Sequence, residues 1–206
     1  MILVRDILVQ NFLVSKNYLE TIKILDGVIY HLEYHQLRVN SALKSKTLQL
    51  SNIITKIPKE GLYRCRIVYN PQEYSVNYIP YTKRKISKLK LIYDDSVSYE
   101  KKYENRELFE KYLEEKEECD DVLIIKNGLL TDTSIANIAL YDGKQWLTPK
   151  EPLLEGTCRA RLLDKQKIYE ADIRIEDFKQ FEKIALMNAM IDFDIIATEK
   201  IEEVIC

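Results

Sequence analysis

The sequence predicts an α+β protein with two lobes. Three observations lead to this fold class: short β-rich runs alternate with stretches of helical periodicity, strong turn signals join paired runs, and a basic stretch over residues 82–90 divides the chain. With 206 residues, the chain can form one large domain or two small ones. We expect a small N-terminal α+β domain over residues 1–87 and a C-terminal domain over residues 88–206.

The first half of the chain reads as strands around helix. The run TIKILDGVIYHL consists of two β-rich segments joined by Asp26-Gly27, which is a strong hairpin signal. The expected elements are a strand pair over 21–32, one or two helices over 33–57, and a second strand pair over 62–70 and 73–81. The basic stretch 82–90 follows as an exposed connection. Contact with nucleic acid is the less favoured interpretation of this stretch, since the charges of the whole chain balance.

The second half repeats the alternation. The run YEKKYENRELFEKYLEEKEE, residues 99–118, carries aromatic and leucine side chains at helical spacing, and its Glu and Lys residues occupy the other face. We therefore expect a helix there. The remaining expected elements are strands over 88–95, 121–126 and 167–173, helices from Gly156 to about Lys167 and near 176–180, and a final strand pair over 183–190 and 193–198.

Composition excludes several classes of function. With 31 Lys and Arg against 33 Asp and Glu, the charges give no case for nucleic acid or an anionic membrane as partner. No run approaches the roughly 18 apolar residues that a membrane span needs, and MILVRDILVQNFLV at the N-terminus is a poor signal peptide. No metal site is expected. The cysteines have no paired spacing, so we interpret all of them as reduced thiols of a cytoplasmic protein: Cys65, Cys119, Cys158 and Cys206.

The polar residues of the second half suit a pyridoxal 5'-phosphate site. Such a site needs a lysine that binds the cofactor covalently, an acid beside the pyridine nitrogen, and N–H groups and cations around the phosphate. Asp132, at the end of a short strand, is the candidate acid. The helix start at Gly156, with the free N–H groups of Thr157 and Cys158, is the candidate phosphate site.

Two further candidates complete this site. Arg38 is the candidate cation for the phosphate, and Lys102, which we place at the head of the 99–118 helix, is the candidate lysine. Each residue also has an ordinary alternative: an exposed aspartate, a solvated helix arginine, or a common Gly-Thr helix start. Among this many lysines, spacing alone selects none.

These residues stand in motifs that resemble the class IV aminotransferases, the fold-type IV pyridoxal phosphate enzymes. The stretch YLETIKILDGVIYHLEYHQLRVNSA is similar to the family's N-terminal pattern and KYENR to its Lys-x-x-Asn-Arg motif. GLLTDTSIANIALYDGKQWLTP resembles the acid-x-x-x-x-Asn signature, LLEGTCR the phosphate-binding helix start, and ALMNAMIDFDII the last pocket strand. The resemblance extends from about residue 18 to residue 197.

The resemblance implies a D-amino acid aminotransferase-like architecture with the cofactor between the lobes, so residues 88–206 become the cofactor-binding domain. It implies that Lys102 holds the cofactor, that Arg38 and the amides after Gly156 hold its phosphate, and that Asn188 lies near the substrate or phosphate. It also implies a homodimer and a small amino or keto acid as substrate. The family's acid is usually glutamate, so the shorter Asp132 must lie closer to the ring.

Two reactions compete in this interpretation. KYENR and Asn188-Ala189 favour a 4-amino-4-deoxychorismate lyase type of elimination that releases pyruvate, whereas an amino acid aminotransferase would pass nitrogen to a 2-keto acid. A hypothesis of another class is a scaffold that binds cofactor or partner without turnover. The presence of both Lys102 and Asp132 argues against such a scaffold.

Overall fold

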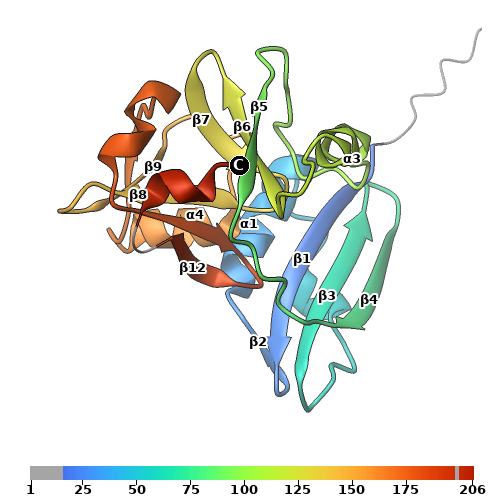
Figure 1. Cartoon of the computed structure of the whole chain (residues 1–206). Coiled ribbons are helices and arrows are strands. Elements are labelled where there is room, and N and C mark those ends of the chain that lie inside the picture. Colours follow the sequence, from blue (N-terminus) through green and yellow to red (C-terminus); the bar gives the residue numbers. More distant parts are fainter. Residues whose placement is uncertain (1–15, 198–199) are drawn as a thin grey trace, which may run out of the picture.

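The N-terminal lobe is a four-stranded antiparallel sheet covered on one face by helix (Figure 1). A computed structural model describes residues 16–197 and 200–206. The sheet has the order β2-β1-β3-β4, and helices α1 and α2 belong to the same lobe. The elements are β1 (Tyr18–Leu25), β2 (Val28–Ile29), α1 (Leu32–Leu43), α2 (Leu50–Ile53), β3 (Leu62–Tyr69) and β4 (Tyr74–Pro80).

Alternating side chains decide which face of this sheet the helices cover. In β1, Ile22 and Ile24 are fully buried, while the alternate residues Thr21 and Lys23 are only partly buried on the opposite face. Since successive strand residues point to opposite faces, one face joins the apolar core under α1 and the other turns toward the second lobe. The hairpin predicted at Asp26-Gly27 is confirmed: both residues have positive φ, as such turns require. The stretch MILVRDILVQNFLV lies outside the described residues.

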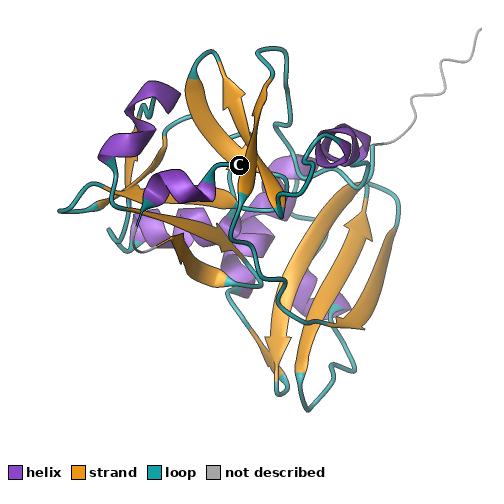
Figure 2. Ribbon diagram, viewed as in Figure 1, coloured by secondary structure: helices purple, strands orange, loops and turns teal. Residues whose placement is uncertain are grey.

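The C-terminal lobe is a mixed eight-stranded sheet (Figure 2). Its central path has the order β10-β9-β8-β7-β6-β5, and β11 pairs with both β8 and β12. The strands are β5 (Leu89–Tyr93), β6 (Asp121–Lys126), β7 (Leu129–Thr133), β8 (Asn137–Tyr141), β9 (Trp146–Pro149), β10 (Tyr169–Ala171), β11 (Lys183–Asn188) and β12 (Asp192–Ala197). The helices are α3 (Glu107–Glu114), α4 (Thr157–Asp164) and the 3₁₀ turns η1 (Ile175–Gln180) and η2 (Ile201–Val204).

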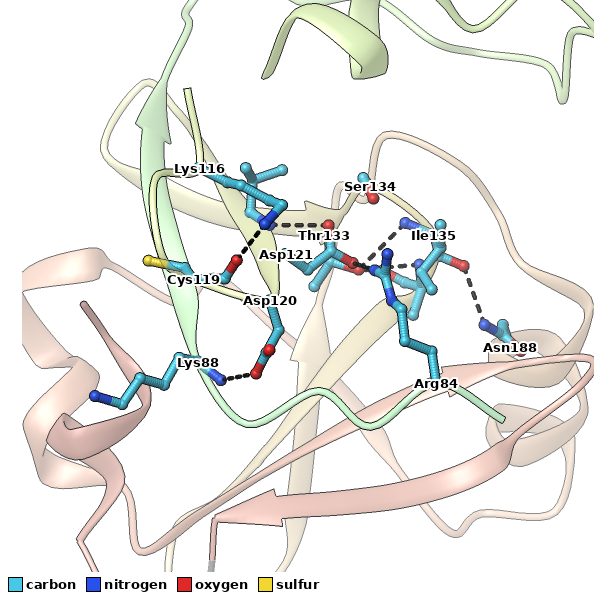
Figure 3. Close-up of polar contacts among 12 residues, drawn as sticks. Arg84, Lys88, Lys116, Cys119, Asp120, Asp121, Thr133, Ser134, Ile135 and Asn188 are labelled. Atoms are coloured by element: carbon cyan, nitrogen blue, oxygen red, sulfur yellow. Dashed lines mark hydrogen bonds and ion pairs between the residues drawn. The ribbon is translucent and has the colours of Figure 1, made fainter. Parts of the chain in front are cut away.

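The basic stretch between the lobes is more firmly held than a solvated linker. Arg84 forms an ion pair with buried Asp121, and Lys88 N–H donates to the Asp120 carboxylate (Figure 3). The backbone N–H of Ser87 donates to the same carboxylate. Ile86 is buried in the apolar core of the C-terminal lobe. These contacts fix the direction in which the chain enters β5. Whether residues 1–87 and 88–206 fold as independent domains stays a prediction.

The expected helix over 99–118 is wrong in its first half. Only α3, Glu107–Glu114, is α-helical, and the chain before it is irregular. Tyr103 forms a β-bridge to Tyr18, and Tyr99 packs edge-on against Tyr103 and Phe109. The bridge to the N-terminal lobe and this aromatic packing outweigh the local helical periodicity.

The expectation of four unpaired thiols is wrong for two of them. The structure joins Cys119 to Cys206, whose Cα atoms are 6.3 Å apart, although 87 residues separate them in the sequence. Cys65 and Cys158 are free and buried. Within residues 16–197 and 200–206, we find no helix of the length and apolar character that crossing a bilayer requires.

Candidate active site

A cavity of about 250 Å³ lies between the lobes and collects most of the predicted residues. Its wall includes Arg38, Lys102, Asp132, Gly156, Thr157 and Asn188. The N-terminal lobe contributes the cavity-facing side of β1 and β3, and the C-terminal lobe contributes the β7–β8 turn, the start of α4 and the end of β11. Because α1 packs against both β1 and α4, Arg38 on α1 belongs to the same wall as the α4 N-terminus.

Lys102 lies in the irregular segment before α3 rather than at a helix head. Its carbonyl accepts a hydrogen bond from Leu19 N–H at 2.8 Å, which fixes this segment to β1. Burial, followed by the nearby charge of Arg38, lowers the pKa of Lys102 to about 7. A lysine with this pKa carries a neutral, nucleophilic amine at neutral pH in a large fraction of molecules. The side chain thus has the property that covalent attachment of a carbonyl compound needs.

Asp132 is held rigidly in β7. Its Oδ1 accepts from Asn137 Nδ2 at 2.7 Å, and its Oδ2 accepts from Leu154 N–H at 2.9 Å. Burial raises its pKa to about 7, against the hydrogen bonds that favour the carboxylate. A buried carboxyl of this kind gains from a cationic partner, and a ring nitrogen that carries a proton supplies one.

Asn137 is the asparagine of the acid-x-x-x-x-Asn signature, and the sequence analysis gave it no role of its own in the site. Besides Asp132, its Nδ2 also donates to Leu154 O at 2.7 Å, so Asn137 joins β7, β8 and the loop before α4. The feature of the sequence that points to Asn137 is its position five residues after Asp132. A Cβ built on Gly156 would overlap Asn137 Oδ1 and come within 3.2 Å of Asn137 Cγ. Position 156 therefore requires glycine for space, since its φ of −72° suits any residue.

We expect Gly156→Ala to weaken both the fold and cofactor binding. The added methyl group must displace Asn137 and with it Asp132, and overpacking of this kind costs about 1–3 kcal/mol. Urea unfolding and the Kd for pyridoxal phosphate measure the two effects. Glu155→Ala, a change at the exposed neighbouring residue, is the matched control and should leave both values near wild type. A Gly156→Ala protein with unchanged Kd would contradict the prediction.

Arg38 belongs to a buried network of charged groups. Its Nε and Nη2 donate to the two oxygens of Glu20 at 2.8 and 2.6 Å, and His35 Nδ1 lies 2.6 Å from Glu20 Oε2. Burial would raise the pKa of Glu20, but the Arg38 charge and the hydrogen bonds outweigh it and hold this pKa at about 2. Burial lowers the pKa of His35, against the Glu20 carboxylate beside it, which acts to raise it. The sequence analysis missed Glu20.

The N-terminus of α4 faces the same cavity. Gly156 is its N-cap without a side-chain cap, and Thr157 is buried at the first helical position. The free N–H groups of a first helical turn favour an anion through hydrogen bonds and through the helix dipole. Arg38 and this turn therefore provide a cation and N–H donors in one wall.

Two predicted residues have side chains engaged elsewhere. Cys158 does not line the cavity: its Sγ donates to Asp192 O at 3.3 Å, and burial raises its pKa to about 11. Asn188 lines the cavity, but its Nδ2 donates to Ile135 O (Figure 3) and its Oδ1 accepts from the N–H groups of Met190 and Ile191. Asn188 therefore shapes the turn between β11 and β12.

Comparisons with known proteins agree with this geometry. A protein of Haemophilus influenzae without assigned function is 34% identical over 180 residues, which are 83% of this chain and 96% of that protein. The crystal structure of a Haemophilus somnus protein assigned as a 4-amino-4-deoxychorismate lyase has a TM-score of 0.79 at 38% identity, over 85% of this chain and 96% of that one.

The same fold extends to more distant proteins. An aminotransferase from Brucella abortus, solved with its cofactor PLP, has a TM-score of 0.72 at 17% identity, over 97% of this chain and 86% of that one. The model of the family described as amino-transferase class IV matches residues 18–196. This match and the two Haemophilus relatives show that the chain belongs to the aminotransferase class IV family.

Proposed function

We propose that the protein is a pyridoxal phosphate-dependent lyase of the 4-amino-4-deoxychorismate lyase type, which eliminates pyruvate from an amino substrate. One observation carries the proposal: Lys102, Asp132 and Arg38 line one cavity together with the N-terminus of α4. The likeness at 38% identity to the Haemophilus somnus protein assigned as such a lyase supports this reaction over transamination.

The residues fit the cofactor. Lys102 is an amine that is neutral in a large fraction of molecules near pH 7, Asp132 is a buried carboxyl, and Arg38 and the α4 N-terminus suit a phosphate. Gly156 leaves the space beside Asn137 that any side chain would fill. When bound, pyridoxal phosphate withdraws electrons from the substrate carbon next to the amine.

The chain's own groups then bind, orient and move protons. Arg38 and the Thr157 amide would hold the phosphate, and Asn137 orients Asp132 as the acid for the ring nitrogen. Lys102 Nζ would hold the cofactor covalently. In its free form this Nζ, with its low pKa, would take a proton from the substrate carbon and later return a proton to the departing fragment. The lowered pKa suits both steps, since the group exchanges protons readily at neutral pH.

Transamination is the second candidate, because the same lysine and acid serve it and the Brucella abortus relative with this fold is an aminotransferase. The two reactions differ in one requirement. A lyase releases pyruvate from the amino substrate alone, whereas an aminotransferase needs a 2-keto acid to complete its cycle.

The test is a set of measurements on one sample. We expect purified protein with pyridoxal phosphate to show a visible absorbance band, and borohydride reduction followed by peptide mapping to place the adduct on Lys102. Pyruvate formation from 4-amino-4-deoxychorismate without a keto acid supports the lyase. Turnover only with a keto acid supports the aminotransferase, and absence of both band and adduct supports a scaffold.

We also propose that the protein acts as a homodimer in the cytoplasm, as its family resemblance suggests. Light scattering on the eluting peak of a size-exclusion column should give about twice the chain mass of 24.3 kDa. A mass of one chain at micromolar concentration would contradict the dimer.

A further inference from the structure

Two arginines of the cavity, Arg64 and Arg106, differ from the other arginines that the structure describes. Of the eight arginines in residues 16–197 and 200–206, six form ion pairs with carboxylates: Arg38, Arg66, Arg84, Arg159, Arg161 and Arg174. Arg64 and Arg106 have no carboxylate partner among the described residues, and both line the cavity. Both side chains are partly buried, and an arginine withdrawn from water without an anion beside it is uncommon, so this pattern needs an explanation.

Arg64 points from β3 toward the second lobe. Its neighbour Cys65 is fully buried in the N-terminal core, so the strand alternation turns Arg64 to the opposite, cavity-facing side. The Nε of Arg64 is buried and has no hydrogen-bond partner among the described residues. A buried N–H donor without partner is rare in native proteins, and a ligand oxygen would satisfy it.

Arg106 reaches the cavity from the other lobe. Its Nη2 donates to Ser134 O at 2.6 Å, and its guanidinium lies over the Phe109 ring, 4.9 Å from the centroid. These two contacts hold the planar group in place while leaving other donors for a ligand. Its charge also contributes to the lowered pKa of Lys102, which places Arg106 near the reacting end of the cavity.

Among the described residues, no carboxylate of the cavity wall forms an ion pair with Arg64 or Arg106. Asp132 is the only carboxylate of this wall among the described residues, and Asn137 and Leu154 already engage both of its oxygens. Arg38, the third arginine of the wall, is paired with Glu20 and lies in the same wall as the α4 N-terminus. An anion bound by Arg64 and Arg106 would therefore be a different group from the phosphate that we assign to Arg38.

We propose that Arg64 and Arg106 bind the carboxylates of the substrate and so determine specificity for a compound with two acidic groups. This inference rests on the proposed function, because it assigns substrate contacts in the same cavity. The planar guanidinium matches a carboxylate through paired N–H donors, which favours carboxylates over neutral polar groups. With one arginine on each lobe, a dicarboxylate also ties the two walls of the cavity together.

The chain offers a matched control on the same strand. Arg66 lies two residues after Arg64 on the same face of β3, but its guanidinium is paired with Glu104 and does not line the cavity. Arg64→Gln and Arg106→Gln remove the two proposed contacts, Arg64→Lys keeps the charge without the fork of donors, and Arg66→Gln removes a charge of the same strand. Retention of the visible cofactor band shows that each variant is folded.

The experiment has two arms on the cofactor-loaded protein. In the first, calorimetry measures binding of isophthalate, a dicarboxylate probe, and of benzoate, its monocarboxylate counterpart. We expect isophthalate to bind more tightly than benzoate, and Arg64→Gln or Arg106→Gln to weaken it at least about 30-fold. Arg64→Lys should weaken it less, and Arg66→Gln should leave it unchanged. Equal affinity of the two probes, or an Arg64→Gln protein that binds isophthalate like wild type, would overturn the proposal.

The second arm measures pyruvate release from 4-amino-4-deoxychorismate. We expect Arg64→Gln to raise KM with little change in the Kd for the cofactor, a split that a purely structural role would not produce. An unchanged KM in the two glutamine variants counts against the proposal. If pyruvate release is absent while isophthalate binding depends on both arginines, the lyase function fails and the carboxylate site stands.

Discussion

Replacing Lys102 by methionine should abolish covalent attachment of pyridoxal phosphate and reduce turnover by at least about 10²–10⁴-fold, the usual contribution of a positioned proton-transfer group. Methionine keeps most of the length and the apolar character of the lysine stem, so the loss of activity reflects loss of the amine rather than loss of packing. Borohydride reduction and mass spectrometry of the peptide measure attachment, and a pyruvate assay measures turnover.

Lys101 provides the control for this substitution. It is the adjacent residue, but its Nζ donates to Ser41 Oγ at 2.9 Å and it does not line the cavity. Lys101→Met should therefore keep both the adduct and the activity. A borohydride adduct that persists in Lys102→Met would show that another amine carries the cofactor.

The pKa of Lys102 also predicts how the rate of cofactor attachment depends on pH. Only the neutral amine attacks a carbonyl, and burial lowers the pKa of Lys102 from 10.5 to about 7. The rate of attachment to the free protein should therefore rise with pH up to about 7 and level off above it. A rate that continues to rise toward pH 10 would place the reacting amine in an exposed position.

Glu20→Gln should destabilise the protein by about 3–5 kcal/mol, the usual effect of breaking a buried ion pair. Glu20 is fully buried and binds both Arg38 and His35, so the change leaves Arg38 charged and without a carboxylate. Urea unfolding at pH 7 measures the loss. Glu33→Gln, on the exposed face of α1, should stay within about 0.5 kcal/mol of wild type.

The Glu20 carboxylate also predicts how stability varies with pH. Its pKa is about 2 in the folded protein against an ordinary value of 4.5, so the unfolded chain binds more protons between these values. The stabilisation, about 3 kcal/mol, is complete above pH 4.5 and is lost as pH falls toward 2. Wild type should show this slope and Glu20→Gln should not. Identical slopes for the two proteins would contradict the assignment of the pair.

Local features of the fold were predictable from the sequence because their causes are local. Asp26-Gly27 forms its turn through positive φ at both residues, and Gly156 begins α4 by sequence signals that lie within one turn. Strand alternation placed the apolar residues of β1 and β3 on one face. The set of predicted site residues was chosen from motif order, and the structure brings all of it except Cys158 to one cavity.

Tertiary contacts decided what the local pattern could not. Residues 99–106 have helical periodicity, yet the bridge from Tyr103 to Tyr18 and the packing of Tyr99 keep this segment irregular beside β1. The same contact places Lys102 in the cavity, where burial lowers its pKa. Desolvation depends on atoms from distant parts of the chain, so no spacing of residues can predict it.

The sequence by itself determined the fold class, the main turns and the chemical types present in the site. The tertiary structure decided the partners: Glu20 with Arg38, Asp132 with Asn137, and the absence of a carboxylate for Arg64 among the described residues. The physical reason is the distance along the chain over which each effect acts. Backbone preferences and periodicity act over a few residues, whereas ion pairing and burial act between groups that only folding brings together.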